Sequence, residues 1–201
     1  MIIILIVILF FSIIIHEVSH GYVAYILGDP TAKYAGRLTL NPAVHIDVIG
    51  TIILPLFLII SNSPILFGWA KPVPINPYNF KNPRKDLMWV GLSGPASNLA
   101  IALILSFIIK ILPHSNFTLI LASGAIINIV LAVINLIPIP PLDGSRIITG
   151  LLPRELAYKY MRLEPFGFII AILFILLFGR SIIQPIIGVI CSLLGLGVYL
   201  P

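Results

Sequence analysis

The chain begins with an apolar run that leads directly into titratable residues. Residues 1–15 carry no polar side chain except Ser12, and the next five residues are His16-Glu17-Val18-Ser19-His20. Residues 2–27 are long enough to cross a bilayer as one helix, and Gly28-Asp29-Pro30 supplies a helix stop. Because an ionisable side chain inside a membrane helix is costly, these residues are candidates for a function.

The composition requires most of the chain to lie in a membrane. Of 201 residues, 59% are hydrophobic and 9% are charged, and the mean hydropathy of +1.13 is far above that of soluble proteins. We therefore predict an all-α polytopic membrane protein, a helical bundle of about four to six membrane segments with a re-entrant or extended segment between the two core helices. The length favours a single integral membrane domain over residues 1–201.

Charge and cysteine content exclude other classes of protein. The net charge of +5 is better explained by cytoplasmic loops than by a nucleic-acid partner. Cys191 is the only cysteine, so an intrachain disulfide and a cysteine-based zinc site are both excluded.

The two histidines of the opening segment have the spacing of a metal site. On a helix, His16 and His20 project from one face because they are four residues apart. Two imidazoles so placed can bind one zinc ion, and Glu17 beside them can serve as the general base of a hydrolytic reaction. A chance match is improbable in a chain with four histidines and seven acidic residues. We predict one zinc ion per chain, with His16 and His20 as ligands and Glu17 as the catalytic base.

The run from Asn135 to Gly144 is a candidate source of the third ligand. Its three prolines end the helix predicted over residues 119–137, and irregular backbone at membrane depth is tolerated where it is buried or lines a wet cavity. Asp143 then either binds the metal or forms an ordinary Asp-Gly turn. The order of membrane crossings favours the ligand, because it returns Asp143 to the side of His16 and His20.

Basic residues set the expected orientation. No Lys or Arg precedes Lys33, so the positive-inside rule places the N-terminus outside and the predicted site nearer the cytosol. Residues 48–68 are apolar but are interrupted by Pro55 and by a turn signal at 61–64, so they form either a full span or a re-entrant hairpin. The basic residues that follow favour re-entry.

Residues 68–77 contain three prolines and are expected to be extended. This stretch is either a surface linker anchored by Trp69 or a strand with which a substrate pairs.

Further polar residues raise other candidates. Asn98 lies in the helix predicted over residues 86–112, where an amide at membrane depth needs a partner. Asn98 and Asn135 are therefore candidates for the active site, with helix packing as the alternative. His45 and Asp47 are possible extra ligands, although solvated or structural roles are the more usual ones for such loop residues.

Three motifs, in order, carry a family resemblance. His16 to His20 in a membrane helix, Gly94-Pro95-Ala96-Ser97-Asn98 in the next core helix, and the stretch from Asn135 to Gly144 resemble the site-2 protease family of intramembrane zinc metalloproteases. The motifs cover most of the chain, and together they are highly specific. The chain leaves no room for the PDZ domain that some members carry, and in this it resembles a compact bacterial or archaeal subgroup.

The resemblance implies zinc bound by His16, His20 and Asp143, with Glu17 as base and with Asn98 and Asn135 holding the substrate or an oxyanion. It also implies a prokaryotic cell membrane, a lipid bilayer environment and a membrane-protein substrate cut in or near its transmembrane segment. The oligomeric state is open, and a homo-oligomer remains among the alternatives. A zinc transporter and a non-catalytic membrane chaperone with a structural zinc are the rival functions.

Overall fold

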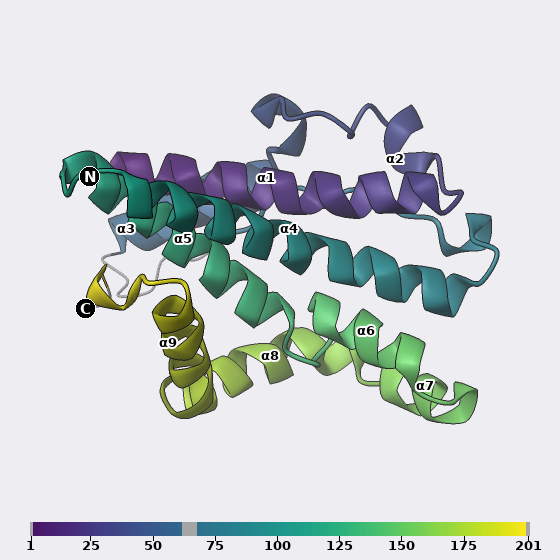
Figure 1. The fold of residues 1–201 in the computed structure, drawn as a ribbon. Helices are drawn as coiled ribbons and strands as arrows, with labels where there is room; N and C mark the ends of the chain where they lie inside the picture. The colour runs from purple at the N-terminus through teal and green to yellow at the C-terminus, as the bar shows by residue number, and fades with distance from the viewer. Residues whose placement is uncertain (1, 62–67, 200–201) are drawn as a thin grey trace.

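The computed structural model describes residues 2–61 and 68–199, and the regular structure in these ranges is helical (Figure 1). The turn predicted at 61–64 falls largely outside them. The helices are α1 (Ile2–Ile26), α2 (Thr31–Tyr34), α3 (Leu54–Ile60), α4 (Pro83–Ile111), α5 (Asn116–Asn135), α6 (Asp143–Leu151), α7 (Arg154–Met161), α8 (Glu164–Phe178) and α9 (Gln184–Leu193).

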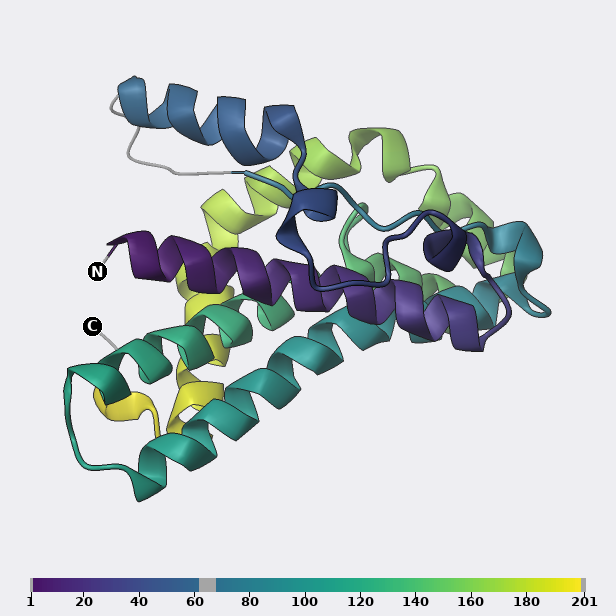
Figure 2. The same cartoon turned by 90° about the horizontal axis from the view of Figure 1, so that it is seen from above.

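Four helical segments in the described ranges are long and apolar enough to cross a membrane. They are α1, α4, α5 and the continuous segment Glu164–Leu193, which contains α8 and α9. The predicted all-α polytopic architecture is thereby confirmed. The last segment turns sharply where α8 gives way to α9 (Figures 1 and 2).

The bundle is centred on α4, which packs against α1, α5 and α6. A buried polar network joins the first three membrane helices: the Asn98 amide donates to Asn128 Oδ1 at 2.8 Å, and the Asn128 amide donates to Ser12 Oγ at 2.9 Å. All three side chains are almost fully buried. Polar groups that are satisfied in this way hold membrane helices in register.

The apolar stretch between the core helices returns to its own start. Its helical part, Val48–Ile60, is shorter than the ~20 residues needed to span a bilayer. At its base the Trp69 amide donates to the Gly50 carbonyl at 3.1 Å, and Thr51 Oγ1 donates to the Trp69 carbonyl at 2.8 Å. Two ends bonded to each other cannot lie on opposite sides of a membrane, so the structure agrees with the re-entrant alternative.

The segment after this hairpin is extended, as its prolines predict, and several hydrogen bonds hold it, including one from the Lys71 amide to the His45 carbonyl at 2.9 Å. A guanidinium nitrogen of Arg37 donates to the Lys71 carbonyl at 2.6 Å. The Val73 amide donates to Glu17 at 2.9 Å, and the Asn76 amide donates to the Asp29 carboxylate at 2.7 Å. Residues 71–76, which we call the extended segment, are thereby fastened beside α1.

Candidate metal centre

Three predicted ligand atoms converge at one point. His16 Nε2 and His20 Nε2 lie 3.0 and 3.1 Å from Asp143 Oδ2, and the two imidazole nitrogens are 3.0 Å apart. The histidines come from α1, and Asp143 is the first residue of α6. All three residues are buried, and they form the one group of three or more such side chains with metal-ligand spacing in the described part of the chain.

The outer nitrogens of both rings have acceptors that fix their orientation. His16 Nδ1 lies 2.6 Å from Asn98 Oδ1, and His20 Nδ1 lies 2.6 Å from the Val90 carbonyl. A carbonyl can only accept, and the Asn98 nitrogen already donates to Asn128, so both Nδ1 atoms are the donors. Partners of this kind orient the ligands of a metal site and raise their basicity.

This arrangement fits a divalent metal such as zinc. With each Nδ1 protonated, the neutral imidazoles point two Nε2 lone pairs and one carboxylate oxygen at the same space. Such a group needs a cation at its centre. Tetrahedral zinc with bonds of ~2.0–2.1 Å keeps its ligand atoms about 3.3 Å apart, close to the 3.0–3.1 Å found here.

Asp143 would bind the cation as a carboxylate, because metal ligands bind in their deprotonated form. In this form Oδ2 offers a lone pair toward the same space as the two Nε2 atoms.

Two glycines allow the ligands to approach one another. A Cβ on Gly94 would lie 2.5 Å from the His20 ring and 2.6 Å from the His16 ring. A Cβ on Gly144 would lie within 2.5 Å of the carbonyl oxygens of Leu136 and Ile137. Gly144 has helical backbone rather than a special turn conformation, so close packing explains this glycine better than the turn expected from the sequence.

Glu17 faces the same cavity as the three ligands. One of its oxygens accepts the hydrogen bond from the Val73 amide, and no hydrogen bond to the other oxygen is found within the described residues. The cavity has a volume of about 260 Å³ and is lined by residues of α1, the extended segment and α6, and by the loop before α6. Asn135, Pro141 and Arg146 complete its walls. The arrangement places two imidazoles, two carboxylates and an amide side chain around one small polar space.

The two asparagines occupy different positions. Asn135 lines the cavity, and its amide nitrogen donates to the Leu131 carbonyl at 3.0 Å. Asn98 is fully buried, does not line the cavity and contacts His16 at Nδ1, the ring nitrogen that does not face Asp143. This position suits the orientation of a ligand better than the substrate or oxyanion contact expected from the sequence.

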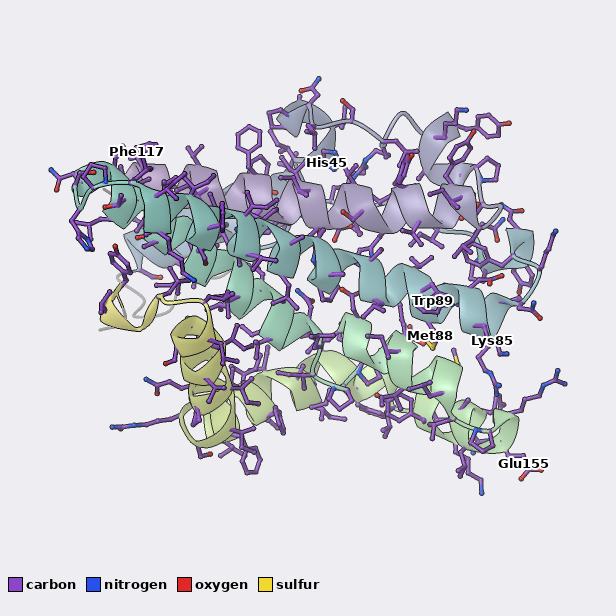
Figure 3. All side chains as sticks on the ribbon, viewed as in Figure 1. His45, Lys85, Met88, Trp89, Phe117 and Glu155 are labelled. Carbon is purple, nitrogen blue, oxygen red and sulfur yellow. The ribbon has the colours of Figure 1, made fainter. Side chains whose placement is uncertain are left out.

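His45 and Asp47 do not join the cluster. His45 is fully buried in the loop after α2 and pairs through Nε2 with the Thr39 carbonyl at 2.8 Å (Figure 3). Asp47 accepts from the Gly50 amide at 2.7 Å and begins the helical turn of Val48–Ile53. Both residues have the structural roles that were the alternative to ligation.

Three contributors to the site were missed from the sequence. The Val90 carbonyl and the Val73 amide are backbone groups, which leave no trace in residue type. Gly94 was identifiable only as one of several small residues that permit close helix packing, with nothing to indicate that imidazoles are its neighbours.

Comparison with known proteins places the chain in a family. The sequence model described as peptidase family M50 matches residues 110–179. A Bacillus subtilis (strain 168) protein named "Putative zinc metalloprotease YwhC" is 39% identical over 196 residues, which cover 92% of this chain and 85% of that protein. The chain belongs to peptidase family M50, the site-2 protease family.

More distant relatives have the same kind of name. Proteins named "Putative zinc metalloprotease Rip2" are 27% identical in Mycolicibacterium smegmatis and 32% identical in Mycobacterium tuberculosis strain H37Rv. The alignments cover 82% and 66% of this chain and only 63% and 51% of those longer proteins. No solved structure matches the chain. Family and architecture together establish a multi-pass membrane protein that is a zinc metalloprotease.

Proposed function

We propose that this M50 protein is an intramembrane endopeptidase that hydrolyses peptide bonds of membrane-protein substrates in or near their transmembrane segments. The observation that carries the proposal is the position of the cluster. His16, His20 and Glu17 lie in the second half of an apolar helix long enough to span a bilayer, and Asp143 meets them from the start of α6. A protease whose polar centre lies at such a depth is suited to substrates that are themselves in the membrane.

His16, His20 and Asp143 would hold the zinc ion through Nε2, Nε2 and Oδ2. Zinc in such a site supplies a Lewis acid that lowers the pKa of water and polarises the scissile carbonyl. Glu17 is held by the Val73 amide through one oxygen, so its other oxygen is left to accept the proton of the attacking water. The same carboxyl then delivers that proton to the leaving amine.

The two asparagines would divide their work. Asn98 holds His16 in the tautomer that presents Nε2, and Asn128 holds Asn98 in turn. Asn135 lines the cavity and retains an amide oxygen and one N–H for a substrate group or a developing oxyanion.

The extended segment offers backbone to a substrate that has been unwound. The Val73 carbonyl and the Ile75 amide have no hydrogen-bond partner in the described part of the chain. A substrate strand pairing with these groups would lie along the wall of the cavity that contains Glu17. This supports the strand interpretation of residues 68–77 over that of a plain linker.

The cellular setting belongs to the same proposal. The resemblance to a compact bacterial or archaeal subgroup supports a prokaryotic cell membrane, and the distribution of basic residues supports an active site nearer the cytosol. The molecule would work in a lipid bilayer, without nucleic acid, as a monomer or a homo-oligomer.

The test uses purified full-length protein and a single-span model membrane protein. We expect the wild type to cut the substrate and Glu17→Gln to leave it intact, while both hold about one zinc per chain. Glu155→Gln, on the exposed surface of α7 (Figure 3), is the matched control and should cut like the wild type.

Cleavage retained by Glu17→Gln would sink the assignment of the base. Zinc flux into sealed vesicles without cleavage would favour a transporter, because transport gives Glu17 no distinct chemical role. Zinc binding with neither flux nor cleavage would favour the chaperone.

A further inference from the structure

A second cavity lies directly beside the catalytic one. It has a volume of about 460 Å³, within the ~300–1,000 Å³ range of ligand pockets, and is bordered by the beginning of α4, by α6 and by the end of α7. Ile75, Pro141 and Arg146 line both cavities. The two cavities are therefore neighbours that share part of their lining, and a chain bound across the metal centre lies close to the second one.

The walls of the second cavity are mainly apolar. Leu87, Pro140 and Met161 contribute hydrocarbon surface. Three of the polar side chains around them have partners: Thr149 Oγ1 donates to the Ser145 carbonyl at 2.7 Å, Tyr160 Oη to the Pro138 carbonyl at 2.7 Å, and Arg84 Nη1 to the Leu152 carbonyl at 2.8 Å. Ser145, Arg146 and Glu164 also line the cavity. Because most of the lining is hydrocarbon, the space favours an apolar guest over a polar one.

The walls are also fixed in place. A Cβ on Gly150 of α6 would lie 2.5 Å from Met88 Cβ of α4, so the two helices are in close contact beside the cavity. Met88 is seen between α4 and the α6–α7 region in Figure 3. A preformed pocket discriminates between side chains by size.

We propose that this cavity is a specificity subsite that receives a large apolar side chain of the substrate, within a few residues of the scissile bond and on one side of it. The inference rests on the proposed proteolytic function. Leu87, Thr149 and Met161, which line this cavity and are not metal ligands, would set which substrate side chain is preferred there.

The first test asks whether a substrate side chain occupies this cavity, and it uses a protein that does not cleave the substrate. In the Glu17→Gln protein with Cys191→Ser, a single cysteine is placed at Met161, and single cysteines are scanned through a model single-span substrate in lipid nanodiscs. Met161 is exposed enough to react. We expect disulfide cross-links confined to one or two neighbouring substrate positions.

The control carries its cysteine at Ala43, an exposed residue that lines neither cavity. Cross-linking at Met161 that is no stronger than at Ala43, or that is uniform along the substrate, would overturn the subsite.

Specificity is tested second, with the wild type, Thr149→Trp and the control Ala43→Trp. Two substrates differ only in carrying Leu or Ala at the cross-linked position. We expect Thr149→Trp to lower kcat/KM for the Leu substrate about tenfold or more relative to the Ala substrate, while Ala43→Trp leaves the ratio unchanged.

Met161→Trp, at a more exposed position, repeats the test should Thr149→Trp fold poorly, with zinc content as the measure of an intact site. An unchanged Leu-to-Ala ratio in a zinc-loaded variant would refute the inference. Failure of the wild type to cut any substrate would instead refute the proposed function, and the cross-linking result would still decide whether the cavity is occupied.

Discussion

Replacing Gly94 by alanine should damage the metal centre although it adds only one methyl group. The new Cβ would lie 2.5 Å from His20 Cε1 and Nε2 and 2.6 Å from His16 Cε1. Ordinary contacts between such atoms begin near 3.5 Å, so helix or rings must move by roughly 1 Å. Both rings are also tied through Nδ1 to α4, which carries Gly94 itself, and this limits their escape.

Two opposing effects determine how Gly94→Ala changes the stability of the protein. Alanine in place of a helical glycine ordinarily stabilises a helix by about 0.5–1 kcal/mol. Overpacking of a filled interior costs about 1–3 kcal/mol. Metal sites tolerate distance errors of only ~0.2 Å, so a displacement of about 1 Å should weaken zinc binding by at least the 10–100-fold that loss of a ligand's hydrogen-bond partner causes.

The assay is competition for zinc against a chelator of known affinity, with the melting temperature followed in parallel. Gly188→Ala is the matched control, because a Cβ there meets nothing within 4 Å. The control should keep its zinc affinity and melt at the same or a slightly higher temperature. Wild-type zinc affinity in Gly94→Ala would show that the rings are not confined as described, and the packing argument would fail.

Three further substitutions test side chains that hold a ligand or the extended segment in place. Asn98→Leu should lower zinc affinity about 10–100-fold, because His16 loses the acceptor that fixes its tautomer; Ser123→Ala, at a half-buried position of α5 whose hydroxyl bonds only to Leu119 of the same helix, should not. Asp29→Asn should cost about 1.5–3 kcal/mol at neutral pH, since Asp29 accepts from Thr31, Asn76 and Asn79. Although burial raises the pKa of Asp29, these hydrogen bonds hold it below its usual value, so the Asp29 contribution is complete above pH ~4 and is lost as the pH falls further. A stability difference between wild type and Asp29→Asn that does not shrink as the pH is lowered below ~4 would contradict this. Arg37→Met should lower kcat at wild-type zinc content, because it removes the bond to the Lys71 carbonyl that holds the extended segment. Arg37→Lys should restore part of the rate. Equal loss of zinc and activity in Arg37→Met would refute this role of Arg37.

The sequence predicted most of what depends on local periodicity. The predicted spans 2–27, 86–112 and 119–137 agree with α1, α4 and α5 to within three residues at either end. The four-residue spacing of His16 and His20 correctly predicted that both rings share a helix face, because helix geometry fixes that relation. Asp143 was brought to the same place by counting membrane crossings and by the family resemblance, because residue spacing alone does not relate it to the histidines.

What the sequence did not predict depends on contacts between helices. Periodicity places Asn98 on a face of α4 but does not say which side chain lies opposite, and the structure places His16 there. The small residues around Gly94 indicated close packing without naming the neighbour. Backbone donors such as the Val73 amide carry no residue-type signal at all.

The orientation of Glu17 depends on residues outside the His16–His20 motif. The Val73 amide that orients its carboxylate belongs to the extended segment, which has no regular secondary structure of its own. That segment has two side-chain anchors, Arg37 through the Lys71 carbonyl and Asp29 through the Asn76 amide. The His45 carbonyl also accepts from the Lys71 amide at 2.9 Å. Arg37 is buried, and within the described residues it makes no ion pair and its Nε has no partner, so its desolvation is offset mainly by the carbonyls it binds. Because a displacement of ~1 Å in a catalytic group can cost about 100-fold in rate, the two anchors should govern catalysis without touching metal or substrate. Loss of rate at constant zinc content therefore distinguishes them from the ligands.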